Sequence, residues 1–282
     1  MIRILTDSAC DILPAEAQQL GVTVIPLNVT LEDGTVLRDG IDMTPSEYYT
    51  HLAACRKLPT TSQPSPELFE KFYLEAAAAG DEVLGIFLSD ALSGTGQCAR
   101  LAADLANVDN VVFVNTENVC LGQSLLVRLA VQLRDAGKTI TQIAADLEKA
   151  KQHLHLVAAV DDLKYLRKGG RISGASALVG SLLQIKPILR GNEEGKIVLF
   201  DKARGKLRAI ERLVSIYKER AIDLDDLIGI SHGDCPGEAL RLETKLREAG
   251  HRGPILLVPH EPVTGAHVGP GMLSLYFHAV GK

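Results

Sequence analysis

Hydroxyl side chains, one imidazole and several glycines gather in three short stretches that lie far apart in the sequence. The first stretch is "TTSQPSPELF" (60–69), in which Ser65 and Pro66 suit the first positions of a helix. That structural role does not explain the hydroxyls of residues 60–62, which prolines flank on both sides. Thr61 and Ser62 are therefore candidate hydrogen-bond donors to a carboxylate or phosphate oxygen.

The second stretch is "SGTGQCA" (93–99), which follows a predicted strand and opens a predicted helix. Free backbone N–H groups at a helix start favour an anion, and Ser93 also suits the helix N-cap. Gly94, Gly96 and Ala99 fit the dinucleotide fingerprint G-x-G-x-x-[GA], with Glu117 at the distance expected for a ribose contact. Four residues separate the predicted strand from Gly94, which weakens this alternative of a dinucleotide-dependent enzyme.

The third stretch is "PVTGAHVGPG" (262–271), in which glycines and two prolines surround His267. Glycine permits positive φ and close approach of the backbone, so this composition predicts a bare, rigid loop that holds the imidazole. The loop-shaping glycines are Gly265, Gly269 and Gly271. A hydrolase that uses Ser93 with His267 on a small acidic substrate is a second enzymatic alternative. The sequence offers no identifiable acid to orient the imidazole, which counts against it.

A basic segment, "DDLKYLRKGGRISG" (161–174), predicts a short helix with a cationic last turn and a glycine cap. Arg171 lies beyond that cap, so the helix does not explain it. It is a candidate contact for an anionic ligand or for an acidic partner surface.

The elements that position these stretches follow from hydrophobic patterning. Short apolar runs alternate with helical patterns up to about residue 150, which predicts a parallel sheet flanked by helices. Later strands are interrupted by only two long helices, which predicts an α+β domain with a mixed or antiparallel sheet. We expect an α/β protein with a Rossmann-like domain at 1–152, a second domain at 153–282 and a ligand cleft between them. The predicted strands are 3–8, 22–29, 82–89, 110–116, 154–160, 196–200, 227–232, 254–259 and 273–280, with a hairpin at 31–40.

Composition excludes several classes of function. The net charge of −5 argues against binding to a nucleic-acid backbone, and the absence of Trp argues against stacking on bases. Five cysteines without a C-x-x-C pair predict neither disulfides nor a zinc ribbon, so we expect no metal and no cofactor. The sequence shows no signal-peptide core and no apolar span, which predicts a cytoplasmic protein without stable membrane insertion.

Eight motifs, in order along nearly the whole chain, closely resemble the DegV family of bacterial fatty-acid-binding proteins. They are "TDSACD", "TTSQPSPELF", "SGTGQCA", "VCLGQSLLV", "DDLKYLRKGGRIS", "QIKPIL", "HGD" and "VTGAHVGPG". The chain departs from the family at Gly96, where relatives often carry a larger, frequently aromatic residue.

The resemblance implies a carrier rather than an enzyme, with one long-chain fatty acid such as palmitate, stearate or oleate buried between two α/β domains. Carried onto this chain, it implies carboxylate contacts from Thr61, Ser62, Ser93 and the Gly94 backbone, with His267 close by. Some members present the fatty acid to a separate, ATP-using kinase subunit that makes acyl phosphate, and Arg171 is a candidate for that contact. Burying about 15 methylenes at roughly 0.8 kcal/mol each yields on the order of 12 kcal/mol, before the cost of immobilising the chain.

Overall fold

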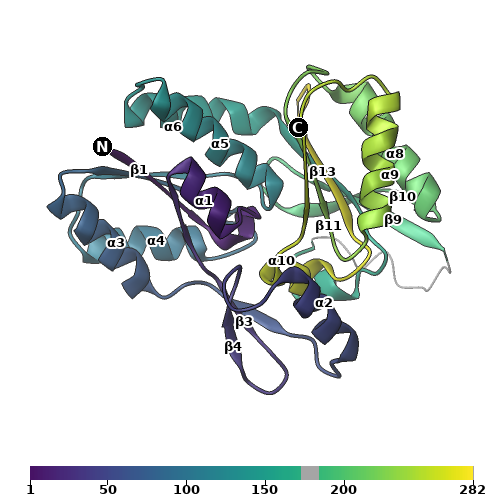
Figure 1. Cartoon of the computed structure of the whole chain (residues 1–282), viewed down its shortest axis with the longest axis horizontal. Helices are drawn as coiled ribbons and strands as arrows, with labels where there is room; N and C mark the ends of the chain where they lie inside the picture. Colours follow the sequence, from purple (N-terminus) through teal and green to yellow (C-terminus); the bar gives the residue numbers. More distant parts are fainter. Residues whose placement is uncertain (173–183, 282) are drawn as a thin grey trace.

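The structure, a computed structural model, describes residues 1–172 and 184–281. Ser173, the last residue of the "DDLKYLRKGGRIS" motif, lies outside the described residues. Two large sheets lie in the two parts of the molecule, the first on the left and the second on the right of Figure 1. None of the helices within the described ranges is long and apolar enough to cross a membrane.

The first sheet has four parallel strands in the order β2-β1-β6-β7, as the alternation of apolar runs and helices predicts. Its strands are β1 (Ile2–Asp7), β2 (Val22–Ile25), β6 (Glu82–Phe87) and β7 (Val111–Asn115). Successive side chains point to opposite faces, so Leu5 and Val83 pack on one side while Ile4 and Leu84 pack on the other.

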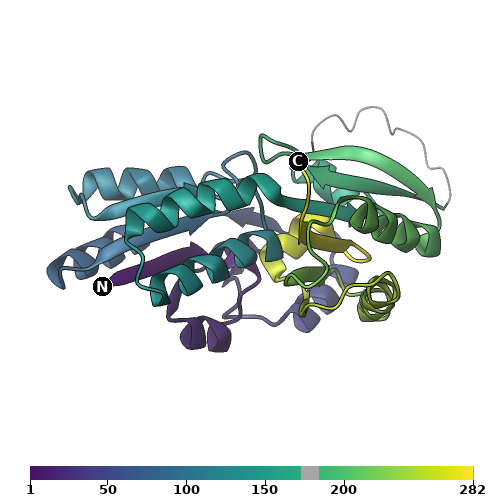
Figure 2. The same cartoon turned by 90° about the horizontal axis from the view of Figure 1, so that it is seen from above.

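Helices cover both faces of this sheet, which explains why its strands are continuously apolar (Figure 2). The helices are α1 (Pro14–Leu20), α3 (Pro66–Ala78), α4 (Thr95–Leu105), α5 (Leu121–Asp135) and α6 (Ile140–Ala150), with a short 3-10 turn η1 (Ser8–Cys10) after β1. Buried residues of α3 and α4 pack on one face, and those of α1, α5 and α6 pack on the other. A capping box starts α6, in which the side chains of Thr139 and Gln142 each accept the other residue's backbone N–H.

The second sheet is mixed, as predicted, with six strands in the order β10-β9-β8-β13-β11-β12. Its strands are β8 (Leu154–Ala159), β9 (Ile185–Gly191), β10 (Ile197–Arg204), β11 (Ile228–His232), β12 (Ile255–Pro259) and β13 (Leu273–His278), and the 3-10 turn η2 (Lys151–His153) leads into β8. Only β11 and β12 pair in parallel among the described strands of this sheet. Helices α8 (Lys206–Arg220) and α9 (Pro236–Glu248) pack on one face through a separate apolar core.

Helix α5 lies between the two sheets and joins their cores. It contacts β1 and β6 of the first sheet, and β8, β11 and β13 of the second. Gly229 on β11 makes this approach possible, because a Cβ there would lie 2.7 Å from the Cβ of Leu121. The two sheets and their helices give the expected α/β fold class. The domain boundary between residues 1–152 and 153–282 stays a prediction.

A small third sheet and three short helices complete the region between the two large sheets. The sheet is antiparallel in the order β4-β3-β5, with β3 (Asn28–Thr30), β4 (Val36–Arg38) and β5 (Thr60–Ser62). The helices are α2 (Pro45–Ala54), α7 (Lys164–Lys168) and α10 (Pro262–Val268), and α10 packs against β3, β5, α2 and α7. The expected hairpin at 31–40 is formed by β3 and β4.

Several predicted elements differ from the structure. The strand expected at 22–29 is split into β2 and β3 around Pro26, which has no N–H to donate to a ladder. Strand β9 was not predicted. Ser65 is the N-cap residue of α3, but its side chain makes no capping bond, and the N-cap of α4 is Gly94 rather than Ser93. The prediction of a bare loop around His267 is wrong, because residues 262–268 form helix α10.

Candidate ligand-binding site

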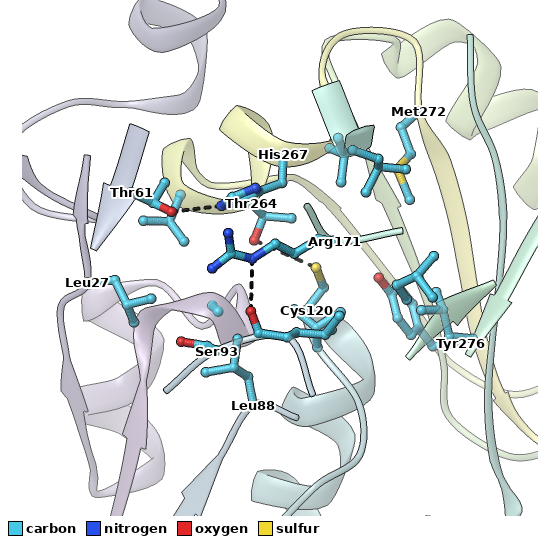
Figure 3. A pocket seen from close by; sticks show the side chains of 18 residues that line it. Leu27, Thr61, Leu88, Ser93, Cys120, Arg171, Thr264, His267, Met272 and Tyr276 are labelled. Atoms are coloured by element: carbon cyan, nitrogen blue, oxygen red, sulfur yellow. Dashed lines mark hydrogen bonds between the residues drawn. The ribbon is translucent and has the colours of Figure 1, made fainter. Parts of the chain in front are cut away.

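A largely apolar cavity lies where the third sheet, α10 and the two large sheets meet (Figure 3). It contains about 660 Å³ of space not occupied by atoms, including the part open to solvent. Aliphatic side chains form most of its wall, from both halves of the chain. Among them are Leu27, Leu88, Val119, Leu156, Ile197 and Met272.

Thr61 reaches this cavity because of its position on β5. It pairs with Val29 of β3, and its side chain is half-buried while those of the neighbouring residues 60 and 62 are exposed. This alternation is the normal two-residue period of a strand. A hydrogen bond of 2.7 Å joins Thr61 Oγ1 to Nε2 of His267, so the strand and α10 meet at the polar end of the cavity.

His267 is held by close packing around α10. Its Nδ1 atom is buried and has no hydrogen-bond partner among the described residues. Burial, and secondarily the charge of Arg171, lowers the pKa of His267 to about 4, so the imidazole is neutral near pH 7. Gly169 makes room for the ring, since a Cβ at that position would lie 2.2 Å from Nδ1.

The turn between β6 and α4 brings Ser93 to the same cavity. The Ser93 hydroxyl lies 2.8 Å from the Thr95 hydroxyl and accepts the Thr95 N–H at 3.3 Å, which orients the turn at the start of α4. Gly94 is next to it but does not line the cavity; a Cβ there would lie 2.4 Å from Oε1 of Gln63.

Arg171 lines the cavity, and its guanidinium donates hydrogen bonds to two backbone carbonyls. Its Nε donates to the Leu92 carbonyl at 3.0 Å, and its Nη1 donates to the Gly169 carbonyl at 2.5 Å. The side chain therefore links the end of α7 to the turn before α4, beside both Ser93 and His267 (Figure 3). A fixed cation at this place favours a ligand with an anionic group.

The structure thus brings together Thr61, Ser93, Arg171 and His267 but leaves out other predicted residues. Ser62 is exposed and does not line the cavity. Of the predicted loop glycines, Gly265 is helical, and Gly269 and Gly271 have φ of 70° and 81°.

Three polar residues of the cavity wall were not predicted: Cys120, Thr264 and Tyr276. The Cys120 thiol donates to the Thr264 hydroxyl at 3.8 Å. Thr264 lies three residues before His267, which is a helical spacing, so recognising α10 in the sequence would have placed both on one face.

The geometry disfavours both enzymatic alternatives. Nε2 of His267 bonds Thr61 rather than Ser93, and no carboxylate bonds Nδ1 among the described residues. For a dinucleotide, residues 88–94 separate β6 from α4, and Glu117 forms an ion pair with Lys151 at 3.1 Å.

An apolar cavity with a few convergent polar side chains, here hydroxyls, an imidazole and a guanidinium, is typical of small-molecule binding sites. Residues 1–279 match the model of a family described as "Uncharacterised protein, DegV family". The chain belongs to the DegV family, as its motifs indicated.

Relatives of known sequence and structure agree with this assignment. The DegV domain-containing protein lin2658 of Listeria innocua is 35% identical over 280 residues, which cover 97% of each chain. A solved DegV family protein from Thermus thermophilus, described as binding a fatty acid, is 32% identical with a TM-score of 0.90 over 99% of both chains. The fatty acid binding DegV family protein SAG1342 of Streptococcus agalactiae is 30% identical, with a TM-score of 0.90 over 100% of this chain and 99% of its own.

Proposed function

We propose that this protein binds a single long-chain fatty acid, such as palmitate, stearate or oleate, with its acyl chain in the cavity. The observation that carries the proposal is the polarity of the cavity wall, which is mostly aliphatic but brings Thr61, Ser93, Arg171 and His267 close together on one side. An acyl chain gains free energy from burial in such a wall, whereas a carboxylate must find several donors there to offset its lost hydration.

The carboxylate would lie at the polar end. Ser93 offers a hydroxyl donor, and Arg171 offers the positive charge. Thr61 can also donate to the carboxylate when the proton of the neutral His267 ring is on Nε2 and is donated to Thr61 Oγ1, so that His267 orients the Thr61 hydroxyl. Ser62 and Gly94 are not in the cavity wall, so in this proposal they support their neighbours rather than contact the ligand.

We further propose that the protein acts as a carrier, not an enzyme, and presents the carboxylate to an ATP-using kinase subunit for acyl-phosphate formation. A second hollow adjoins the polar end from the outside and is lined by Lys168, Arg171, Thr61 and His267. Two cationic side chains at that opening suit an acidic partner surface or a phosphorylated product. The five cysteines are all free thiols, which fits a reducing compartment such as the cytoplasm.

Mass spectrometry of lipid extracted from the purified protein tests the binding proposal. We expect one fatty acid per chain, or one-to-one uptake of added palmitate or oleate by delipidated protein. Absence of both would overturn the proposal.

The carrier step needs a separate test with the loaded protein, a fatty acid kinase subunit and ATP, with acyl phosphate trapped by hydroxylamine. We expect Arg171→Gln to lower product formation more than it lowers fatty-acid retention. An equal loss of both would assign Arg171 to ligand binding alone.

A further inference from the structure

Three side chains of types that can ligate a metal converge at the wall of the apolar cavity. One ligand atom each from Asp11, Cys120 and His260 lie within 4.8 Å of one another, and all three residues are buried. Asp11 follows η1, Cys120 immediately precedes α5, and His260 follows β12. The cluster therefore joins two segments of the first half of the chain to one segment of the second.

Hydrogen bonds orient two of the three side chains, Asp11 and His260. Nε2 of His260 lies 3.2 Å from the Ser274 hydroxyl, which leaves Nδ1 facing Asp11 Oδ2 at 3.4 Å. The Ser231 hydroxyl donates to the same Asp11 oxygen at 3.2 Å. Metal-ligating imidazoles are commonly oriented through their second ring nitrogen in this way, and ligating carboxylates are held by similar bonds.

One carboxylate oxygen of the cluster lacks a protein partner. Oδ1 of Asp11 is buried and has no hydrogen-bond partner among the described residues. A buried carboxylate oxygen without a partner is costly, so the molecule gains if a cation completes its environment.

The backbone of two ligands is also unusual. Asp11 has φ of 54° and Cys120 has φ of 57° with ψ of −138°, although neither is glycine. Non-glycine residues held in such sparsely populated conformations are concentrated at functional sites. Asp11 is in the left-handed helical region, whereas Cys120 lies outside the common backbone regions.

The donor set selects the class of metal. Thiolate, imidazole and carboxylate together suit Zn²⁺, whereas Mg²⁺ and Ca²⁺ prefer oxygen alone. Binding of Zn²⁺ would release the thiol proton to solvent and replace it with the metal–sulfur bond.

We propose that Asp11, Cys120 and His260 form a zinc site with three protein ligands and a fourth position directed toward the lipid cavity. Cys120 lines that cavity, as does Thr264, whose hydroxyl accepts the thiol proton at 3.8 Å (Figure 3). Water or a ligand oxygen that reaches the wall would complete the tetrahedron. The site does not depend on the proposed fatty acid, because Asp11 and His260 do not line the cavity.

The test uses the full chain, delipidated and stripped of metal with a chelator. After dialysis against Zn²⁺ and then against metal-free buffer, elemental analysis should find one zinc per chain. Substitution with Co²⁺ should give a thiolate-to-cobalt charge-transfer band in the near ultraviolet. Cys120→Ser should lose both signals, Asp11→Asn should lose stoichiometric zinc, and Ser274→Ala should weaken zinc binding by roughly 10- to 100-fold.

Cys98→Ser is the matched control, since Cys98 is also buried but donates to the Pro64 carbonyl away from the cluster. It should keep one zinc per chain. Zinc retained by Cys120→Ser, or a wild-type Co²⁺ spectrum without a thiolate band, would overturn the proposal and leave a plain hydrogen-bond network. The wild-type Co²⁺ spectrum tests the zinc site even if a variant fails to fold. The separate assay of fatty-acid uptake distinguishes failure of the zinc proposal from failure of the proposed function.

Discussion

The bond between Thr61 and His267 offers the most direct test of the polar end of the cavity. Thr61→Val keeps the shape and strand preference of the residue while it removes the hydroxyl that lies 2.7 Å from Nε2. Because Nδ1 has no partner either, the variant leaves both ring nitrogens unpaired and removes one donor to the carboxylate. Hydrogen bonds to charged groups contribute about 1.5–3 kcal/mol, so the dissociation constant should rise roughly 10- to 100-fold.

Displacement of a fluorescent fatty acid by oleate, near neutral pH, measures this change on delipidated protein. Ser62→Ala is the matched control, because Ser62 is the next residue of the same strand but is exposed. Its affinity should stay within about twofold of wild type, as for most surface substitutions. Equal affinity of Thr61→Val and wild type, or an equal loss in both variants, would refute the assignment of Thr61 to the carboxylate site.

Three further predictions follow from packing and burial. Gly169→Ala should weaken fatty-acid binding about tenfold or more, because its Cβ would lie 2.2 Å from Nδ1 of His267; Gly237→Ala, which meets nothing within 4 Å, should not. Burial, and then the charge of a nearby aspartate, raises the pKa of Glu261 from 4.5 to about 8. The contribution of this carboxyl group to folding stability is therefore fully present below pH 4.5 and is lost as pH rises through 8. Glu261→Gln should therefore raise the melting temperature at about pH 9 more than at about pH 5, and a pH-independent difference would contradict this. Met272→Phe, across the cavity from the polar end, should weaken binding of stearate more than of myristate in the displacement assay.

The parallel sheet was predictable because its strands are buried on both faces and read as continuous apolar runs. Strand β5 was not, since "TTS" has no apolar alternation and becomes a strand only by pairing with β3. The sequence therefore identified both Thr61 and Ser62 as candidate ligand contacts. It did not show that their side chains alternate between the two faces of a strand. That alternation turns one side chain into the cavity and the other toward solvent.

Helix α10 escaped prediction because tertiary contacts outweigh its low helix propensity. A Cβ at Gly265 would lie 2.9 Å from the ring of Tyr48, so glycine is needed for close packing on α2 rather than for a turn. In the first turn of α10, the backbone N–H of Val263 donates a hydrogen bond to the Asp39 carboxylate at 2.8 Å. A partner so distant in sequence gives no local signal of a helix start. The cluster of Asp11, Cys120 and His260 was invisible for the same reason, since its members share no sequence spacing.

The neutrality of His267 decides how the site handles the charge of its ligand. Arg171 already supplies a cation, and its guanidinium is tied to two backbone carbonyls. A second cation would have to be desolvated beside it, and burial together with the charge of Arg171 instead lowers the pKa of His267 to about 4. The imidazole signal of His267 in delipidated protein should therefore stay at its neutral chemical shift from about pH 8 to about pH 5 in an NMR titration. A titration midpoint near the ordinary value of 6.5 would show that the ring is solvated. The packing of Gly169 and Thr61 around the ring could then not explain its orientation.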